Sequence, residues 1–218
     1  MIRHLRTTVL ASVAVVGLTF GVTPPAAAQL GGRSAEEWIK TLESTNRLQG
    51  LKIAETVAAL ELKPGQLVAN IGAGTGVFSL PLARAVRPGG TLYAVEVDEK
   101  LLEYITESAT EQGVANVQPV YGEYDDPLLP AEVDLAFIHD VLHHIEKRDV
   151  YLKNLAGYLK PSGRVAIIDF VAGRGGHRDD GKMQLTKDQV AAMMAQAGLK
   201  PVREIDLFDD KWFVIYRK

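Results

Sequence analysis

Apolar and polar residues alternate along this chain in a pattern that predicts strands and helices in turn. Short apolar runs typical of strands occupy residues 67–71, 91–96, 117–121, 133–138, 164–171, 202–207 and 213–216. Helical spacing of apolar residues falls between them, at 77–86, 99–112, 146–159 and 186–197. This alternation predicts an α/β fold, a Rossmann-like doubly wound sheet of seven strands with helices on both faces. Only residues 208–212 separate the last two strands, so we expect the seventh strand to be antiparallel to the sixth.

One or two helices are expected before the first strand, over residues 34–60. Ser34 and Glu37 have the spacing of a capping box, and apolar residues recur after them. Two side chains here allow alternative interpretations. Trp38 and Arg47 either form a lid over the loop at residues 72–76 or, the interpretation we favour, Trp38 packs against the core and Arg47 is a solvated charge.

The first 28 residues have the pattern of a secretory signal peptide. Arg3, His4 and Arg6 precede an uncharged stretch at 7–22, and the segment ends in Ala-x-Ala at Ala28. We therefore expect cleavage after Ala28 and a periplasmic or secreted protein. A membrane anchor is the alternative, but the uncharged run is short for a span, and no stable span is expected after cleavage. The predicted organisation is a signal peptide at 1–28, a helical cap at 29–60 and one domain at 61–218.

Composition narrows the classes of function. The net charge is −3 and no Lys/Arg cluster stands out, so nucleic acid is not an expected partner. The sequence has no Cys, which excludes disulfides, a cysteine nucleophile and cysteine metal ligands. Nothing in the composition indicates an oligomeric state.

A glycine-rich loop follows the first predicted strand. Gly72, Gly74 and Gly76 lack Cβ atoms, so the backbone can bend sharply and approach a ligand closely. Strand, loop and following helix together are typical of a nucleotide pocket. Glu96 ends the second predicted strand, where a carboxylate can accept both hydroxyls of a ribose. The alternative is that Glu96, like Asp98, is an acid at a helix N-terminus.

Three segments in order, LVANIGAGTG at 67–76, YAVEVDEKLL at 93–102 and VDLAFIHDVLHHI at 133–145, resemble motifs of the class I S-adenosylmethionine-dependent methyltransferases. The resemblance covers nearly the whole chain after the signal peptide. It implies a seven-stranded sheet with a reversed last strand. It also implies that S-adenosylmethionine lies over Gly72, Ala73, Gly74 and Gly76, with Glu96 on the ribose diol and Val97 beside the adenine.

At two places in the chain the family resemblance does not fully define the cofactor contacts. Asn70 stands where many family members have Asp. Its amide can still hold the loop by hydrogen bonding, but it lacks the charge that favours the cofactor's ammonium or sulfonium. The acid that commonly meets the adenine amine has three candidates here, Glu123, Asp125 and Asp126, and the sequence does not choose among them.

Three histidines and an aspartate directly follow the fourth predicted strand, at the edge where doubly wound sheets bind ligands. His139 and Asp140 are predicted to border the methionine end of the cofactor. His143 or His144 then lies near the acceptor as an orienting group or general base. A polar cap for the helix near residue 146 is the alternative role. Metal binding is not expected, because Asp140 is the only obvious further ligand.

These observations predict an enzyme that transfers a methyl group from S-adenosylmethionine to a small-molecule acceptor. His177 and Arg178, in the loop at 172–183, either touch the acceptor or are solvated. A non-catalytic adenosyl-binding or envelope-associated module with the same fold is the alternative. A nicotinamide-dependent oxidoreductase is disfavoured, because Phe78 stands where its loop motif has a third glycine.

Overall fold

The computed structural model describes residues 33–174, 180–181 and 183–218 of the 218-residue chain. The predicted signal peptide, with Arg3, His4, Arg6 and Ala28, lies outside the described residues. His177 and Arg178 lie outside them as well.

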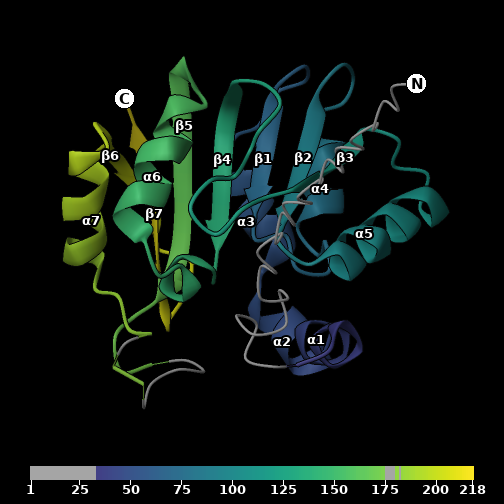
Figure 1. Ribbon diagram of the computed structural model, residues 1–218, viewed down its shortest axis with the longest axis horizontal. Helices are drawn as coiled ribbons and strands as arrows, with labels where there is room; N and C mark the ends of the chain where they lie inside the picture. The colour runs from purple at the N-terminus through teal and green to yellow at the C-terminus, as the bar shows by residue number, and fades with distance from the viewer. Residues whose placement is uncertain (1–32, 175–179, 182) are drawn as a thin grey trace, which may run out of the picture.

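The described chain builds one seven-stranded sheet, as the hydrophobic pattern predicts (Figure 1). Its order is β3-β2-β1-β4-β5-β7-β6, and all pairs are parallel except those of β7, which is antiparallel to both β5 and β6. The strands are β1 (Leu67–Ile71), β2 (Thr91–Glu96), β3 (Val117–Tyr121), β4 (Val133–His139), β5 (Leu159–Phe170), β6 (Lys200–Glu204) and β7 (Lys211–Arg217). The predicted reversal of the last strand is therefore confirmed.

Helices cover both faces of the sheet, which confirms the doubly wound architecture. The helices are α1 (Ala35–Leu42), α2 (Thr45–Gly50), α3 (Ile53–Ala59), α4 (Ser79–Ala85), α5 (Glu99–Glu111), α6 (Arg148–Gly157) and α7 (Lys187–Gln196), with a short 3-10 helix, η2, at Leu142–His144. Apolar residues of α4, α5 and the end of α3 pack on one face. Those of α6 and α7 pack on the other.

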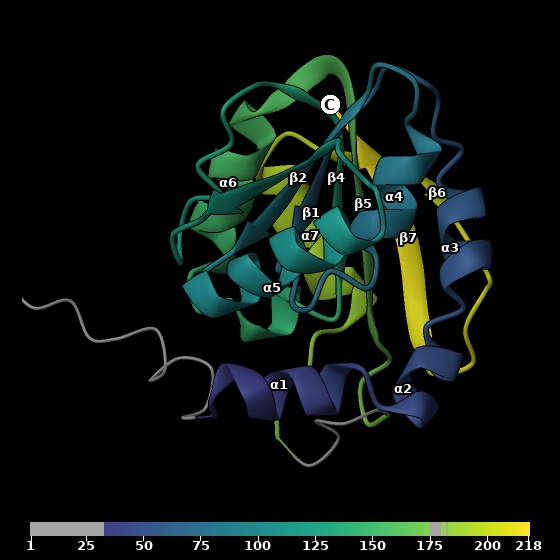
Figure 2. The same ribbon diagram turned by 90° about the vertical axis from the view of Figure 1, so that its right-hand side faces the viewer.

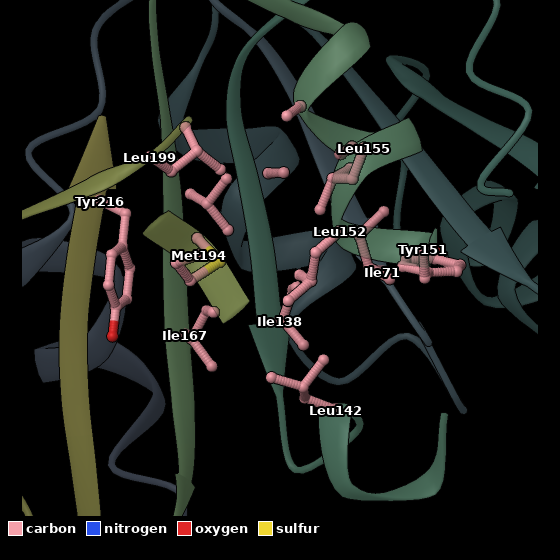
Figure 3. Close-up of a cluster of buried hydrophobic side chains, with 14 of the residues drawn as sticks. Ile71, Ile138, Leu142, Tyr151, Leu152, Leu155, Ile167, Met194, Leu199 and Tyr216 are labelled. Carbon is pink, nitrogen blue, oxygen red and sulfur yellow. The ribbon is translucent and has the colours of Figure 1, made fainter. Parts of the chain in front are cut away.

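The core is therefore two apolar layers separated by the sheet. On the α6 and α7 side, Leu152, Met194 and Ile167 are fully buried, and Figure 3 shows their side chains between the helices and the strands. On the other side the buried residues include Leu82, Phe137 and Phe213. Central strands buried on both faces read as near-continuous apolar runs, which is why the sequence reveals them clearly.

Several element boundaries differ from the sequence prediction, and β6 covers 200–204 where 202–207 was predicted. β5 begins at Leu159 and not at Arg164, because Leu159 pairs with Val133 before the register shifts to Arg164 opposite Leu135. The segment before β1 forms three short helices and not one or two. Lys52, with φ 44°, turns the chain between α2 and α3.

Helices α1 and α2 lie beyond the carboxyl ends of the parallel strands in both views (Figures 1 and 2). Ser34 caps α1 and forms the predicted capping box with Glu37. The Cδ1 atom of Leu42 lies 3.1 Å from the position that a Cβ on Gly74 would take, so α1 rests on the glycine loop. None of the described helices is long and apolar enough to cross a membrane.

The favoured interpretations of Trp38 and Arg47 are wrong. Trp38 is half-buried beneath the guanidinium of Arg33, outside the two core layers. The Arg47 side chain is 28% exposed, and its Nη2 atom lies 3.7 Å from Oδ2 of Asp140. Because α1 and α2 cross the ligand edge of the sheet and not its faces, Leu42 and Arg47 meet the site. The alternative lid role therefore fits the position of Arg47, and for Trp38 it stays a prediction.

Candidate active site

The glycine loop between β1 and α4 has the backbone that its glycines predict. Gly72, Gly74 and Gly76 have φ values of 63°, 56° and 81°. A Cβ on Gly72 would lie 2.5 Å from Cγ2 of Val141, so a larger residue would collide with the loop after β4. Ala73 fixes the turn by donating its N–H to the Val95 carbonyl at 2.9 Å. The loop therefore lies directly beside the ends of β2 and β4.

The side chain of Asn70 connects the strand before this loop to the helix after it. Its Nδ2 donates to Oγ of Ser79 at 2.9 Å, and both side chains are buried. The bond ties β1 to the first turn of α4, which confirms that an amide at this position can hold the loop by hydrogen bonding. Thr75, within the loop, has a buried hydroxyl without a hydrogen-bond partner among the described residues.

Glu96 closes the loop at the end of β2. Its Oε2 accepts the Gly74 N–H and its Oε1 accepts the Val97 N–H, both at 2.8 Å. The side chain is almost fully buried, and burial raises the pKa of the carboxyl. Each carboxylate oxygen has a second lone pair, so Glu96 can still accept two hydroxyls.

Asp140 is the centre of a charged cluster at the end of β4. Its φ is 55°, in the left-handed region, and this turn aims its carboxylate at residues from two other elements. Oδ2 accepts a bond from Nζ of Lys211 at 2.7 Å and also faces Arg47. Burial alone would raise the pKa of Asp140, but the positive charges of Lys211 and Arg47 help to lower it. Oδ1 is buried without a partner in the described part of the chain.

His139 is a neutral imidazole at the same edge. Burial lowers its pKa to about 3, while Lys211 and Arg47 add to that effect and Asp140 opposes it. Its ring lies 4.7 Å from that of Phe78, and its Nδ1 atom lies 3.3 Å from Oδ2 of Asp140. The Nε2 atom is buried and has no partner among residues that the structure describes.

His143 forms a buried pair with a residue that the sequence reasoning did not single out. Its Nδ1 atom lies 2.7 Å from Oδ1 of Asp169, which also accepts the N–H of Phe170. Asp169 and His143 are both almost fully buried, whereas His144 is exposed. A partner on Nδ1 fixes the orientation of the imidazole, which is what a general base needs. The alternative role as a polar helix cap does not apply to His143.

The three acids after β3 lie together in the loop that leads to β4. Glu123 is exposed, and its N–H donates to the Asp126 carbonyl. Asp125 lies 3.4 Å from Nζ of Lys147, and Asp126 accepts the Leu128 N–H through its side chain. Which acid meets the adenine, and whether Val97 flanks it, stay predictions.

Within the described ranges, no group of three or more His, Asp or Glu side chains is placed to hold a metal ion. The residues that sequence reasoning missed are Asp169 and Lys211. A signal existed for Asp169, which is an acid inside the otherwise apolar run of β5. No local signal existed for Lys211, because it is 71 positions away from Asp140.

Part of the chain is similar to known proteins. Residues 69–167 match the family model described as a methyltransferase domain. A relative from Burkholderia multivorans, named as a ubiquinone/menaquinone biosynthesis C-methyltransferase, is 26% identical over 117 residues, which cover 54% of this chain and 48% of the relative. The chain thus matches only about half the length of this relative.

Solved structures share the fold over most of the chain. A SAM-dependent methyltransferase from Aquifex aeolicus has a TM-score of 0.74 at 23% identity, covering 84% of this chain and 98% of that one. Magnesium protoporphyrin IX methyltransferase from Synechocystis, with bound SAH, has a TM-score of 0.62 at 21% identity, covering 78% and 84%. This likeness shows that the chain has the fold of these methyltransferases, while the family match covers less than half of the chain. The first of the two solved proteins depends on S-adenosylmethionine, and the second holds bound S-adenosylhomocysteine.

The residues at this edge of the sheet fit S-adenosylmethionine. Bare glycine backbone lies beside a buried acid, Glu96, that has accepting lone pairs left. The unpartnered Oδ1 of Asp140 and Nε2 of His139 lie buried at the end of the neighbouring strand. Buried polar atoms without partners are costly, so a ligand that satisfies them binds with a gain in free energy.

Proposed function

We propose that this protein is an enzyme that transfers the methyl group of S-adenosylmethionine to a small-molecule acceptor. When bound, the cofactor supplies a methyl group on a sulfonium, whose bond electrons stay on sulfur as the acceptor forms the new bond. The main observation in support of this proposal is the loop of Gly72, Gly74 and Gly76, which lies beside the buried carboxylate of Glu96 in a methyltransferase fold. We also propose that the signal peptide ends at residue 28 and that the helical cap ends at residue 60.

Each residue has a stated role in this proposal. Glu96 accepts the ribose hydroxyls, and Gly72 to Gly76 let the cofactor approach the backbone. His139 and Asp140 border the methionine end of the cofactor. His143, oriented by Asp169, takes a proton from an acceptor that must lose one, and His144 lies beside it with ring centroids 4.2 Å apart. The remaining rate enhancement comes from the alignment of the acceptor with the methyl group.

Export belongs to the proposal as well, because the pattern of residues 1–28 predicts a signal peptide. We place the mature protein in the periplasm or outside the cell. A reporter fused to residues 1–40 tests this placement directly: export and cleavage after Ala28 support it, and retention of an uncleaved fusion contradicts it.

The proposed activity is tested by calorimetric titration of the purified protein with S-adenosylmethionine and S-adenosylhomocysteine. We expect micromolar binding of both. Glu96→Ala should weaken binding more than tenfold without unfolding the protein, because the ribose loses its charged acceptor. Glu103→Ala is the matched control, since its side chain is exposed on α5 and belongs to no predicted site. Absence of binding by the folded protein would overturn the proposal and favour a non-catalytic module.

A further inference from the structure

A row of positively charged residues crosses three strands at one end of the sheet. Arg164 of β5 is in register with Arg217 of β7, and Arg217 is in register with Lys200 of β6. Residues directly opposite each other in antiparallel strands place their side chains on the same face, with Cβ atoms about 5 Å apart. These three side chains, which we call the cation row, therefore lie side by side.

The cation row lies at the end of the sheet opposite the glycine loop. β7 is antiparallel to β5, so its last residues lie beside the early part of β5. Figure 1 shows the C-terminus at the far end of the sheet from α1 and α2, the helices beside the predicted cofactor site. None of the residues assigned to the proposed function belongs to the row, so it is a separate feature of the molecule.

A fourth cation lies on the same face. Ala166 and Ile215, each two positions from the row on its own strand, belong to the apolar layer that includes α3 and α4. The row therefore points to this side of the sheet. Arg203 of β6 is in register with Ile215 and lies on that side as well. Because positions 164, 200, 203 and 217 meet only in the folded chain, the sequence shows no basic cluster.

The charges of the row are not neutralised within the described ranges. The side chains of Arg164, Arg217 and Lys200 form neither a hydrogen bond nor an ion pair with any residue that the structure describes. Arg164 is half-buried. Burial and the charge of Arg217 lower the pKa of its guanidinium, and the carboxylate of Glu61 only partly offsets this. Like charges directly opposite each other destabilise a sheet, so the row lowers the stability of the fold.

Protection of the sheet edge explains only part of the row. β6 is an edge strand, and a Lys followed by a Pro at positions 200 and 201 discourages pairing with another chain. β5 and β7 are internal strands. Edge protection therefore accounts for Lys200 but not for Arg164 and Arg217, and these two need another explanation.

Glu61 shows how an anion meets these cations. The residue lies two positions after the end of α3 and has a φ of 52°, in the left-handed region. Its Oε1 accepts a bond from Nη1 of Arg203 at 2.7 Å, and its side chain is 65% exposed. One solvated carboxylate therefore already lies among the cations, and it is bound to Arg203 and not to the row.

The arrangement of the row favours a phosphate group. A guanidinium donates two parallel hydrogen bonds to carboxylate or phosphate oxygens, and a lysine adds a point charge. Neighbours about 5 Å apart can bind different oxygens of one tetrahedral group. A carboxylate has two oxygens and one charge, whereas a phosphate monoester has three free oxygens and nearly two charges at neutral pH. The phosphate monoester therefore matches three cations better.

We propose that the cation row binds the phosphate group of an anionic ligand. Arg164 and Arg217 bind its oxygens, Lys200 adds the third charge, and Glu61 competes with the ligand for Arg203. The phosphate belongs either to a free phosphorylated molecule or to the headgroup of a lipid, since both offer the same chemistry. This site is independent of the proposed methyl transfer.

The site is tested by calorimetry of the purified protein with pyrophosphate, at an ionic strength held constant with sodium chloride. We expect saturable binding. Arg164→Met and Arg217→Met keep an apolar stem and remove the guanidinium, and each should raise the Kd about tenfold or more, the effect of losing a charge-assisted hydrogen bond. Neither variant should melt below the parent protein, because each removes one of two like charges that lie opposite each other.

Glu61→Gln should have the opposite effect. It removes the competing charge and keeps the shape of the side chain, so we expect the Kd for pyrophosphate to fall about two- to fivefold. A rise in the Kd would mean that Glu61 supports the site and does not compete for it, which contradicts the proposed arrangement.

Lys200→Ala and Lys153→Ala form a matched pair. Both lysines are exposed and neither forms an ion pair in the part of the chain that the structure describes, but Lys153 lies on α6, over the other face of the sheet. We expect Lys200→Ala to raise the Kd about twofold or more and Lys153→Ala to leave it unchanged. Equal effects would mean that pyrophosphate responds only to net charge, and the inference would fail.

Vesicles of phosphatidylcholine, with and without phosphatidic acid, distinguish the two sources of the phosphate. Binding of pyrophosphate shows that a free phosphate suffices. Sedimentation with phosphatidic acid vesicles that is lost in Arg164→Met, without binding of pyrophosphate, assigns the site to a lipid headgroup. Binding of neither probe overturns the inference.

Calorimetry with S-adenosylhomocysteine on the same sample keeps the two proposals apart. Saturation with it should leave the Kd for pyrophosphate unchanged, because the row lies at the other end of the sheet. Competition between the two would place pyrophosphate at the glycine loop and overturn the inference. If pyrophosphate binds and S-adenosylhomocysteine does not, the methyltransferase proposal fails alone.

Discussion

His139 shows how burial changes the charge state of a single residue. Because its pKa falls to about 3 in the folded protein, the imidazole stays neutral at pH values where an unfolded histidine is charged. The unfolded state therefore binds more protons between pH 6.5 and 3, and stability decreases as the pH falls through that window. At pH 7 this effect is nearly absent, and at pH 5 it amounts to about 2 kcal/mol.

We accordingly expect the free energy of unfolding to fall by about 2 kcal/mol more in the parent protein than in His139→Gln between pH 7 and pH 5. Urea unfolding at pH 7, 6 and 5 measures the difference. His144→Gln is the control, because that ring is exposed. Parallel pH profiles for the parent protein and His139→Gln would mean that His139 is not held neutral.

At the residue level, the sequence indicates the groups that follow one strand but not those that converge from several. Gly72, Gly74 and Glu96 are predictable because a strand end, a loop and a second strand end are local patterns. Asp140 was also found, but its partners Arg47 and Lys211 come from α2 and β7. Nothing in the local pattern around Lys211 distinguishes a buried cation from a strand-end charge.

At the level of elements, strands were predicted more accurately than the helices before them. Buried strands such as β1 and β2 have apolar runs with clear ends, and their predicted bounds agree with the structure. The segment at 34–60 has an apolar pattern long enough for one or two helices. It breaks into three because it turns around the carboxyl edge of the sheet, and a helical pattern alone does not contain that turn.

Helix α1 has little buried surface. Ala35 is its only fully buried residue, and α1 is held by its contact with Gly74 and by the bond from Tyr104 to Glu43, 3.0 Å long. Elements with little buried apolar surface open locally without global unfolding. Since α1 rests on the glycine loop, we expect its opening to uncover Gly74.

Removing the N-cap of α1 should increase this local opening. We expect Ser34→Ala to accelerate hydrogen exchange of the α1 amides by about 2- to 30-fold, the effect of losing a cap worth about 0.5–2 kcal/mol, with an unchanged urea midpoint. Thr186→Ala is the matched control, because Thr186 and Gln189 form the same capping box on α7. There Val190 and Met194 are buried in the core, so the cap should alter global stability. A lower midpoint for Ser34→Ala would show that α1 unfolds only with the whole domain.

The site forms because the order of the strands in the sheet differs from their order along the sequence. Arg47, Asp140 and Lys211 meet because β4 and β5 are neighbours, β7 inserts beside β5, and the helices before β1 fold back over the same edge. The alternation of elements predicted the sheet and the reversal of its last strand. The register between distant strands depends on side-chain packing across the sheet, which one sequence does not display, and so the composition of the site could be predicted only in part.

This strand order leads to a prediction about the C-terminal segment. Because β7 lies between β5 and β6, removal of residues 211–218 takes an internal strand out of the sheet. It also removes the buried Phe213, Ile215 and Tyr216 from the two apolar layers. We expect the shortened chain to lose cooperative thermal unfolding, as followed by near-ultraviolet circular dichroism and calorimetry, since β5 would be left as an unpaired apolar edge.

Removal of Lys218 alone is the matched control. Its Nζ atom donates to the Leu159 carbonyl at 2.7 Å, and losing one such bond should cost about 1 kcal/mol with the cooperative transition retained. A cooperative transition in the chain that ends at residue 210 would mean that β7 adds to a sheet that is already stable. Asp140 would then lose only Lys211, and cofactor binding would fall without loss of the fold. The two outcomes therefore decide whether β7 is part of the scaffold or a late addition that completes the site.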